Sequence, residues 1–349
     1  MGPPGLVQVS ELGDPPDRIV NQAEQQRLLS VWSKHVRPTM MDGTADFEDF
    51  FEQAARLDAA VQAFGENRIW LYLGDATKGR NLATGETRLL DRLRHLPVFG
   101  SQITSEALSP ANRVERLADG YMDLAAFQRS AGRRMILADH DGELDSELVT
   151  ACQDLGAADG QVFVKSAFPK SFAGRVHLTD PSDSECIFSD LVRQLAWTMV
   201  QDRRFLVQEL ITMRYEYRFF VVDGRLVTGA GCIKEFTPLN NDLSAFDTVV
   251  REHRREHSAR ERRPDIVARL YDHACGIVRD IAVERPQLNR YTLDMAIDER
   301  DRPLAIELNG LLNSGLYASQ PLLLAKAMDR LYPKHELPTE PVRRVFWLH

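Results

Sequence analysis

The sequence predicts an α+β protein with more than one domain, and three observations support that prediction. The chain has 349 residues, which is more than a single hydrophobic core usually holds. Apolar, strand-like runs become frequent from residue 134 onward, and two pairs of them are joined by short polar turns. Residues 264–286 carry an amphipathic helical pattern that begins at a proline. We therefore expect antiparallel hairpins packed with helices.

The N-terminal part is predicted to be mainly helical. Residues 1–18 are rich in proline and glycine and are expected to form a loose tail. From residue 21 onward apolar side chains recur at helical spacing, until Gly65 is expected to end the pattern. The run RIWLYLG, residues 68–74, predicts a buried strand. Residues 86–100 predict a short helix followed by another apolar segment, and residues 111–132 predict a helical stretch broken near Gly120.

The rest of the chain is predicted to contain most of the strands. Residues 134–139 form a short strand pattern, and residues 215–233 form two strands joined at Asp223-Gly224, a typical tight-turn pair. A second hairpin is expected around the polar loop 299–302. We expect four segments, namely a flexible tail at 1–18, an N-terminal subdomain at 19–130, a larger domain at 131–330 and a C-terminal extension at 331–349.

Composition and charge exclude several classes of protein. Hydrophobic residues make up 44% and charged residues 27% of the chain, as in ordinary globular proteins. The net charge of −8 argues against a protein that coats nucleic acid. The four cysteines are widely spaced and form no C-x-x-C pair, which predicts reduced thiols rather than a zinc or disulfide framework. These are Cys152, Cys186, Cys232 and Cys275.

No membrane or export signal is expected. The N-terminus lacks a basic start followed by an apolar run, and no stretch approaches the roughly 18 apolar residues that a spanning helix needs. We therefore expect a cytoplasmic protein with no membrane partner, and its oligomeric state is left open.

Acidic and amide side chains interrupt the strands of the second hairpin. Glu307 and Asn309 are two residues apart, so they project from the same face of a strand. Asp294 lies on the partner strand and can converge with them. Two carboxylates and an amide oxygen suit magnesium held beside phosphate oxygens. A solvated strand face is the alternative, but the combination favours a metal site.

Two lysines flank a loop of small residues. Lys165 ends an apolar strand, and Lys170 precedes the sequence Ser-Phe-Ala-Gly. Such a pair can clamp a polyphosphate, with backbone donors supplied by the loop. The Walker pattern G-x-x-x-x-G-K is absent, and two surface lysines remain the alternative.

A third group of candidates lies between residues 208 and 234. Gln208, Glu209 and Leu210 follow a strand and can hold an adenosine, with Glu209 facing the ribose hydroxyls. Arg218 is predicted to bind phosphate or an acyl phosphate. Glu216, two residues earlier on the same strand face, is predicted to orient Arg218. Lys234 is a further candidate contact to phosphate or to the transition state. An ordinary cross-strand ion pair is the alternative interpretation of Glu216 and Arg218.

The segment 251–263 is densely charged, with six arginines, three glutamates and two histidines. An ordered lid over an anionic substrate and a solvated or mobile loop are both possible, and we favour the loop because charge runs are usually solvated. If the segment does face the site, Arg251 is the expected substrate contact because it lies nearest the strands.

Taken in order, these residues resemble the ATP-grasp superfamily over residues 134–320. The order is a strand lysine, a loop lysine, Q-E-L, E-x-R, and then Asp with E-x-N on a hairpin. The ending AIELNGLLNSGLYAS is similar to a clade of prokaryotic and phage ATP-grasp proteins related to the eukaryotic assembly factors of initiation factor two. The positions that carry this similarity are Lys165, Lys170, Glu216, Arg218, Glu307, Asn309, Ser314, Gly315 and Tyr317.

The resemblance implies an ATP-grasp fold for the domain at 131–330, in which two α+β subdomains with antiparallel sheets clamp ATP. It implies that the N-terminal α/β subdomain at 19–130 precedes the ATP-grasp domain and binds the substrate. It implies that Lys165, Lys170 and Glu209 contact ATP, and that Asp294, Glu307 and Asn309 hold Mg²⁺. The resemblance also implies that Glu216 of the E-x-R element binds the nucleotide. It implies that Ser314 and Tyr317 contact the substrate. The strand at 134–139 departs from the family pattern, because it has arginines nearby but no lysine.

The resemblance also implies an activity. It favours an ADP-forming ligase that activates a carboxylate as an acyl phosphate for attack by an amine, with Lys170, Arg218 and Lys234 stabilising the transferring groups. An ATP-binding assembly factor or peptide-binding module is one alternative, and a small-molecule phosphotransferase is another.

Overall fold

The structure is a computed structural model. It describes residues 22–35, 47–73, 78–89, 98–100, 121–122, 124–166, 172–201, 203–241, 244–253, 258–311, 314–331 and 344–348. The described chain divides into two units. The first takes its residues from Met1–Glu115, Arg214–Ile297 and Ile306–His349, and the second from Arg116–Met213 and Asp298–Ala305.

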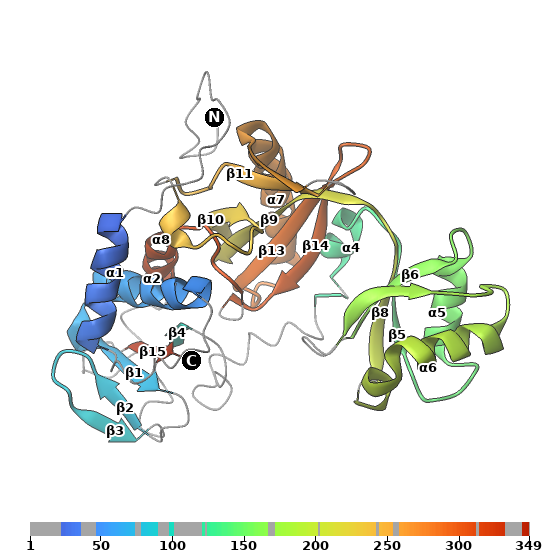
Figure 1. Cartoon of the computed structure of the whole chain (residues 1–349), viewed down its shortest axis with the longest axis horizontal. Coiled ribbons are helices and arrows are strands. Elements are labelled where there is room, and N and C mark those ends of the chain that lie inside the picture. The colour runs from blue at the N-terminus through green and yellow to red at the C-terminus, as the bar shows by residue number, and fades with distance from the viewer. Residues whose placement is uncertain are drawn as a thin grey trace. The chain divides into compact units, whose positions relative to one another are not determined.

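The first unit contains three sheets and most of the helices (Figure 1). Its helices are α1 (Gln22–His35), α2 (Phe47–Phe64), η2 (Glu66–Arg68), η5 (Pro238–Asn240), α7 (Pro264–Glu284) and α8 (Pro321–Leu331). Its strands are β1 (Ile69–Leu73), β2 (Lys78–Asn81), β3 (Thr87–Leu89), β4 (Val98–Gly100), β9 (Met213–Val222), β10 (Arg225–Gly231), β11 (Val249–His253), β12 (Ser258–Arg262), β13 (Arg290–Asp298), β14 (Pro303–Asn309) and β15 (Arg344–Leu348).

The sheet that carries the predicted metal ligands has the strand order β10-β9-β13-β14. Strands β9 and β10 are antiparallel, and the turn between them has positive φ at both Asp223 (54°) and Gly224 (64°). That is the backbone of the tight turn predicted for this pair. Strands β13 and β14 form the second predicted hairpin, whose tip is assigned to the second unit. Both predicted hairpins are therefore confirmed.

A second sheet of the same unit has the order β3-β2-β1-β15-β4. The predicted strand at 68–74 is confirmed as β1, which pairs in parallel with β15 and antiparallel with β2. The short helix expected within residues 86–100 is wrong for residues 87–89, which form strand β3 opposite β2. Cross-strand pairing therefore outweighed the helical spacing of the apolar residues there. Residues 90–97 lie outside the described part of the chain.

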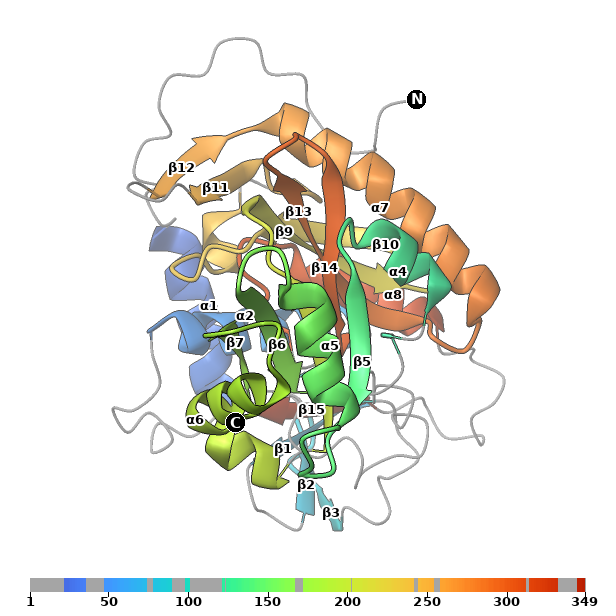
Figure 2. The ribbon, with the colours of Figure 1, turned by 90° about the vertical axis from the view of Figure 1, so that its right-hand side faces the viewer.

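The charged segment 251–263 is a two-stranded hairpin where the structure describes it. Strands β11 and β12 pair antiparallel, from Val249 opposite Arg262 to His253 opposite Ser258. Our preference for a solvated loop is therefore wrong for these strand residues, because backbone pairing orders them despite their charge. The helix predicted at 264–286 follows as α7, which contacts β10 (Figure 2).

The N-terminal helices pack with α8 in one apolar core. Leu28 and Trp32 of α1, Phe51 and Leu57 of α2, and Met328 of α8 all belong to this buried cluster. The helix predicted between residue 21 and Gly65 is present as two helices, α1 and α2, with residues between them outside the described chain. Gly65 follows α2 with a φ of 80°, as expected of a glycine that ends a helix.

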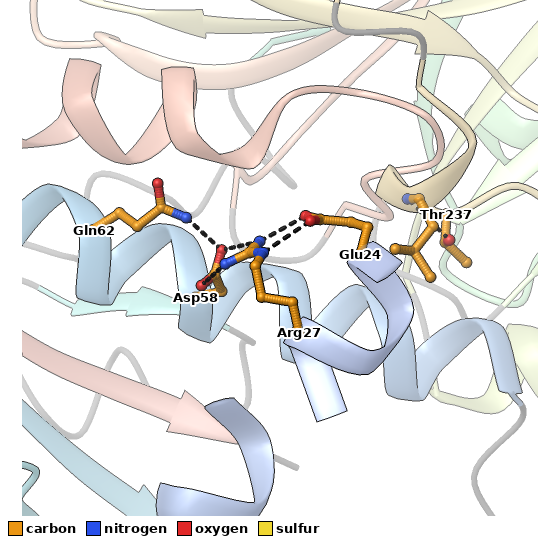
Figure 3. Close-up of polar contacts among 6 residues, drawn as sticks. Glu24, Arg27, Asp58, Gln62 and Thr237 are labelled. Carbon is orange, nitrogen blue, oxygen red and sulfur yellow. Dashed lines mark hydrogen bonds and ion pairs between the residues drawn. The ribbon is translucent and has the colours of Figure 1, made fainter. Parts of the chain in front are cut away.

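An arginine with two carboxylate partners also connects α1 to α2. The Arg27 guanidinium donates to Glu24 on its own helix (2.6 and 2.8 Å) and to both oxygens of Asp58 on α2 (2.5 and 2.7 Å). Gln62 donates a further bond to Asp58 (2.6 Å), as Figure 3 shows. These bonds add a directional contact to the apolar packing of the two helices.

The second unit is one four-stranded sheet with helices. Its strands, in the order β5-β8-β6-β7, are β5 (Met135–Asp139), β8 (Arg204–Glu209), β6 (Gln161–Ser166) and β7 (Ala173–His177). Its helices are α4 (Ala125–Ser130), α5 (Glu147–Gly156) and α6 (Ser184–Gln201). Side chains of α5 and α6 form a buried core with Val162, Val164, Phe205 and Val207, and the helices cover that face of the sheet (Figure 2).

Two sequence predictions fall in this unit. The strand expected at 134–139 is confirmed as β5. Of the helical stretch expected at 111–132, residues 125–130 are helix α4, and residues 111–120 lie outside the described chain. Among the described helices of both units, none is long and apolar enough to cross a membrane.

Candidate functional site

A buried ion pair lies at the centre of the four-stranded sheet of the first unit. Asp294 on β13 is fully buried, and Arg218 on the adjacent strand β9 is 9% exposed. Arg218 donates Nε–H to Asp294 Oδ1 and Nη2–H to Oδ2, both at 2.7 Å. This two-point geometry compensates two charges that would be costly to bury separately.

The other two predicted metal ligands meet this pair. Asn309 Nδ2 donates to Glu307 Oε1 at 2.7 Å and to Asp294 Oδ2 at 3.3 Å. The structure thus brings Asp294, Glu307 and Asn309 together, as the hairpin pattern predicted. Asn309 acts here as a donor, so binding a metal through its oxygen would require its amide to turn about its last bond. The role of all three as metal ligands stays a prediction.

Glu216 adds a third carboxyl to this group. Burial, followed by repulsion from Asp294 and Glu307, raises the pKa of Glu216 to about 7, against a smaller opposing effect of Arg218. Burial also raises the pKa of Asp294, although Arg218 opposes the shift and Glu307 adds to it. One guanidinium therefore does not neutralise all three carboxyls. We call Glu216, Asp294 and Glu307 the acidic cluster.

The acidic cluster has the chemistry of a site for a hard cation. Its donors are oxygens, and burial, with repulsion between the carboxyls, raises the pKa of Glu216 and Asp294. A bound divalent ion would favour the charged form of both groups. No group of three or more His, Cys, Asp or Glu side chains in the described chain is arranged to hold a metal by itself. Magnesium would therefore need further oxygens from Asn309, water or phosphate, as is usual for this ion.

Glu216 was expected to orient Arg218, but Arg218 is oriented by Asp294 instead. The two residues share a strand face, yet the partner with the required geometry lies on the neighbouring strand. Cys232, which follows β10, is a neighbour that sequence reasoning missed. Its N–H donates to Glu216 O at 3.0 Å, and burial together with the charges of Asp294 and Glu216 raises the pKa of its thiol.

The motif S-G-L-Y near residue 315 lies beside Arg218. Arg218 donates Nη1–H to Gly315 O at 3.3 Å, and its Cζ lies 5.2 Å from the centre of the Tyr317 ring. Burial raises the pKa of the Tyr317 hydroxyl above its usual range. The Ser314 hydroxyl is buried and bonds Thr292 Oγ1 and Gly310 O, both at 2.9 Å. Tyr317 is thus placed at the site, whereas the Ser314 side chain holds the loop to β13.

Two further candidates of this unit are less closely tied to the acidic cluster. Lys234 is exposed, two residues beyond Cys232. Arg251 on β11 donates to Glu235 Oε2 at 2.5 Å, so an acidic side chain already accompanies it. The structure does not test the roles predicted for either residue.

Of the predicted nucleotide contacts in the second unit, Lys165 and Gln208 lie on the sheet face opposite its helical core. Lys165 is half-buried on β6, opposite Leu206 of β8, and Gln208 of β8 is opposite Phe163. These positions alternate with the core residues Val164 and Val207, so they point to the other face. Leu210 directly follows β8, and Lys170 lies outside the described residues.

Two arginines that sequence reasoning left without a role bind the residues of the Q-E-L motif. Arg133 donates to Gln208 Oε1 at 2.7 Å, and Arg134 donates its side chain to Glu209 Oε1 at 2.6 Å and its backbone N–H to Oε2 at 2.9 Å. Arg134 lowers the pKa of Glu209 through these bonds. The residues just before β5, where the family's lysine is lacking, therefore supply arginines to the Q-E-L motif.

A surface cavity of about 340 Å³ lies between β10 and α8 in the first unit. Its lining includes Arg225, Leu226, Leu323, Lys326 and Arg330, and no predicted site residue lines it.

Comparison with known proteins assigns the family. The family model for the ATP-grasp domain of the R-two-K clade, family 2, matches residues 147–327, which is more than half of the chain. No curated protein matches the chain.

Solved structures with detectable similarity are distant. The RimK domain ATP-grasp protein of Sphaerobacter thermophilus is 14% identical with a TM-score of 0.38, over 62% of this chain and 67% of that one. The ATP complex of D-alanine–D-alanine ligase from Bacillus anthracis is 11% identical with a TM-score of 0.38, over 63% and 68%. D-cycloserine synthetase is 13% identical with a TM-score of 0.41, over 63% and 71%.

The family match confirms the resemblance that the ordered motif residues carried. Its range includes Lys165, the Q-E-L motif, the E-x-R strand and the E-x-N hairpin. The mixed helices and antiparallel sheets agree with the predicted α+β class. The chain belongs to the ATP-grasp superfamily, as a member of family 2 of the R-two-K clade.

Proposed function

We propose that this protein is an ADP-forming ligase that uses Mg-ATP to join a carboxylate to an amine. The observation that carries the proposal is the acidic cluster with its single buried guanidinium, Arg218, in a chain of the ATP-grasp superfamily. Clustered carboxyls with raised pKa values favour a metal–phosphate site, and a fixed guanidinium favours an anionic reactant beside it.

The reaction has two steps. A carboxylate oxygen of the substrate attacks the γ-phosphorus of ATP, the bond to the β-phosphate oxygen breaks, and ADP leaves. An amine nitrogen then attacks the acyl carbon, inorganic phosphate leaves, and the nitrogen loses a proton. Catalysis of such steps depends mainly on positioning and on neutralising charge.

The residues of the chain are assigned to these tasks as follows. Asp294, Glu307 and Asn309 hold Mg²⁺, which when bound neutralises phosphate charge. Arg218 binds the transferring phosphoryl group or the oxyanion of the acyl intermediate, and Tyr317 borders the substrate. The remaining assignments rest on the family order: Lys165, Lys170, Gln208, Glu209, Leu210 and Glu216 for the nucleotide, Lys234 for catalysis, and Arg251 and Ser314 for the substrate.

Product analysis tests the proposal. Purified protein is incubated with ATP, Mg²⁺ and a panel of amino acids and short peptides that supplies both carboxylates and amines, and products are identified by mass spectrometry. We expect ADP, phosphate and a condensed product that loses one water relative to the two substrates. A released phosphorylated substrate would show a phosphotransferase instead. ATP turnover that requires a protein partner and yields no condensed product would show an assembly factor or peptide-binding module.

A further inference from the structure

We infer that the Glu52–Arg56 pair on helix α2 positions the catalytic Arg218 by clamping the backbone on both sides of Gly315. The inference rests on the proposed function, because it assigns the pair to the same site. Glu52 and Arg56 come from the N-terminal region, in which no residue type or spacing indicated a role in this chemistry.

The clamp consists of hydrogen bonds between groups far apart in the sequence. Arg56 donates Nη2–H to Ser314 O at 2.7 Å, and the N–H of Leu316 donates to Glu52 Oε2 at 2.9 Å. Glu52 Oε1 accepts from Arg56 Nη2 at 2.8 Å, as expected one helical turn apart. Both carboxylate oxygens of Glu52 are thus used, one within the helix and one on the loop.

The clamped loop leads directly to Arg218. Gly315, between the two clamped residues, accepts a bond from Arg218 through its carbonyl oxygen, and Tyr317 lies against the guanidinium. The same guanidinium holds Asp294 in the acidic cluster. A shift of residues 314–317 would therefore move a hydrogen-bond acceptor and a ring that both define the position of Arg218.

The energetics favour a positioning role over a purely stabilising one. Arg56 is 2% exposed, and α2 otherwise contributes apolar residues such as Phe51 and Leu57 to the core. Its Nη1 atom is buried without a hydrogen-bond partner among the described residues. A buried ion pair with an unsatisfied donor stabilises a fold less than an apolar side chain would. The Glu52–Arg56 pair instead supplies directional hydrogen bonds to the N–H and C=O groups of the loop backbone.

The test compares Glu52→Gln with Asp58→Asn as a matched control. Both substitutions change a carboxylate on α2 to an amide and weaken a bond to an arginine, but Asp58 contacts Arg27 and Gln62 rather than the loop (Figure 3). An amide has a single acceptor oxygen, so the side chain of the Glu52→Gln variant cannot place one oxygen on Arg56 and another on Leu316. Arg56→Lys keeps one donor and the charge, and serves as the conservative variant.

For Glu52→Gln we expect kcat to fall about 10- to 100-fold, since a displacement of about 1 Å has effects of that size. The KM for ATP should change by less than about threefold, because the substitution weakens stabilisation of the transition state and leaves the binding of ATP in the ground state unchanged. Hydrogen exchange at Leu316 should accelerate about tenfold or more as its acceptor is lost. Asp58→Asn should leave all three quantities unchanged, and Arg56→Lys should lose less kcat than Arg56→Met.

Two results would overturn the inference. One is unchanged kcat and Leu316 exchange in Glu52→Gln, and the other is an equal loss of kcat in Asp58→Asn, which would show general destabilisation. Neither result affects the proposed function, which is judged from the products of the unaltered protein. Conversely, if that protein makes no product, the ligase proposal fails, while exchange at Leu316 still reports whether the clamp exists.

Discussion

At the scale of single residues, Arg218 connects most of the candidate site. Its guanidinium bonds both oxygens of Asp294 and the carbonyl of Gly315, and it lies against the Tyr317 ring. Burial alone would lower its pKa, but Asp294 holds that pKa above the usual range, so the side chain remains charged. A permanent, immobile positive charge next to three carboxyls is suited to binding a phosphate that arrives with its own cation.

The Arg218–Asp294 pair allows a prediction about stability. Arg218→Met should lower the free energy of unfolding by about 3–5 kcal/mol, because it leaves the fully buried Asp294 without its partner. The double variant Arg218→Met with Asp294→Asn should lose less, because no unpaired charge remains. Urea unfolding followed by circular dichroism measures both. A double variant less stable than Arg218→Met would contradict this electrostatic explanation.

A second residue-scale prediction concerns the proposed metal ligands. Glu307→Gln should reduce ATP turnover at least about 100-fold, because an amide is a much weaker magnesium ligand than a carboxylate. The Glu307 side chain is only partly buried and accepts a bond from Asn309 that an amide oxygen can also accept, so folding should be retained. Steady-state ADP release and the thermal unfolding midpoint are measured together. Normal turnover with the fold intact would exclude the assigned metal site.

At the scale of elements, the site depends on hairpins that hold neighbouring strands in register. The β9–β10 turn has positive φ at Asp223 and Gly224, and β9 is the strand that carries Glu216 and Arg218. Asparagine, aspartate and glycine tolerate this conformation better than other residues. Local sequence chemistry thus determines where β9 turns, whereas the pairing of Arg218 with Ala230 also depends on a register shift between Leu226 and Thr228 of β10.

Glycine-to-alanine substitutions in this turn and in α7 should change the stability of the protein in opposite directions. Gly224→Ala should destabilise the protein by about 1 kcal/mol, because its φ of 64° is unfavourable for a side chain. The nearest atom to an added Cβ is Ala282 Cβ at 3.5 Å, an ordinary contact, so crowding is not the cause. Gly276→Ala within α7 meets nothing within 4 Å and should stabilise by up to about 1 kcal/mol.

Denaturant midpoints of the two variants are compared under the same conditions. Destabilisation by both substitutions would show that backbone conformation does not determine the sign of the stability change.

At the scale of the whole molecule, the predicted site residues fall into two groups. Lys165, Gln208 and Glu209 belong to one unit, and Arg218, the acidic cluster and the loop 314–317 belong to the other. Because the proposed function includes the binding of Mg-ATP, we expect this ligand to stabilise the folded chain.

Thermal unfolding with and without ligand tests this expectation. Mg-ATP at one hundred times its Kd should add about 2.7 kcal/mol to the free energy of unfolding. Removing the metal with EDTA should reduce the gain, and the Glu307→Gln variant should lose the magnesium-dependent part. A gain that is independent of both magnesium and Glu307 would contradict the assigned metal site.

Much of the fold and part of the site could be predicted from sequence. The turn at Asp223-Gly224, the E-x-N strand and the helix beginning at Pro264 each depend on neighbours within a few residues, and each is present. The strands of the 251–263 segment were missed because pairing between β11 and β12 outweighed the charge of their side chains. The partner of Glu209 was missed because it lies 75 residues earlier, at Arg134.

The sequence by itself determined the α+β class, the superfamily and the strand faces that carry the acidic and basic candidates. The class and the strand faces follow from periodicity and turn chemistry, which are local properties, and the superfamily follows from the resemblance of the ordered motif residues to a known family. Only the tertiary structure decided that Arg218 pairs with Asp294 rather than Glu216, and that Glu52 and Arg56 bind the loop at 314–316. Such choices depend on which buried charges and backbone groups folding brings within about 3 Å of each other, and sequence distance carries no information about that.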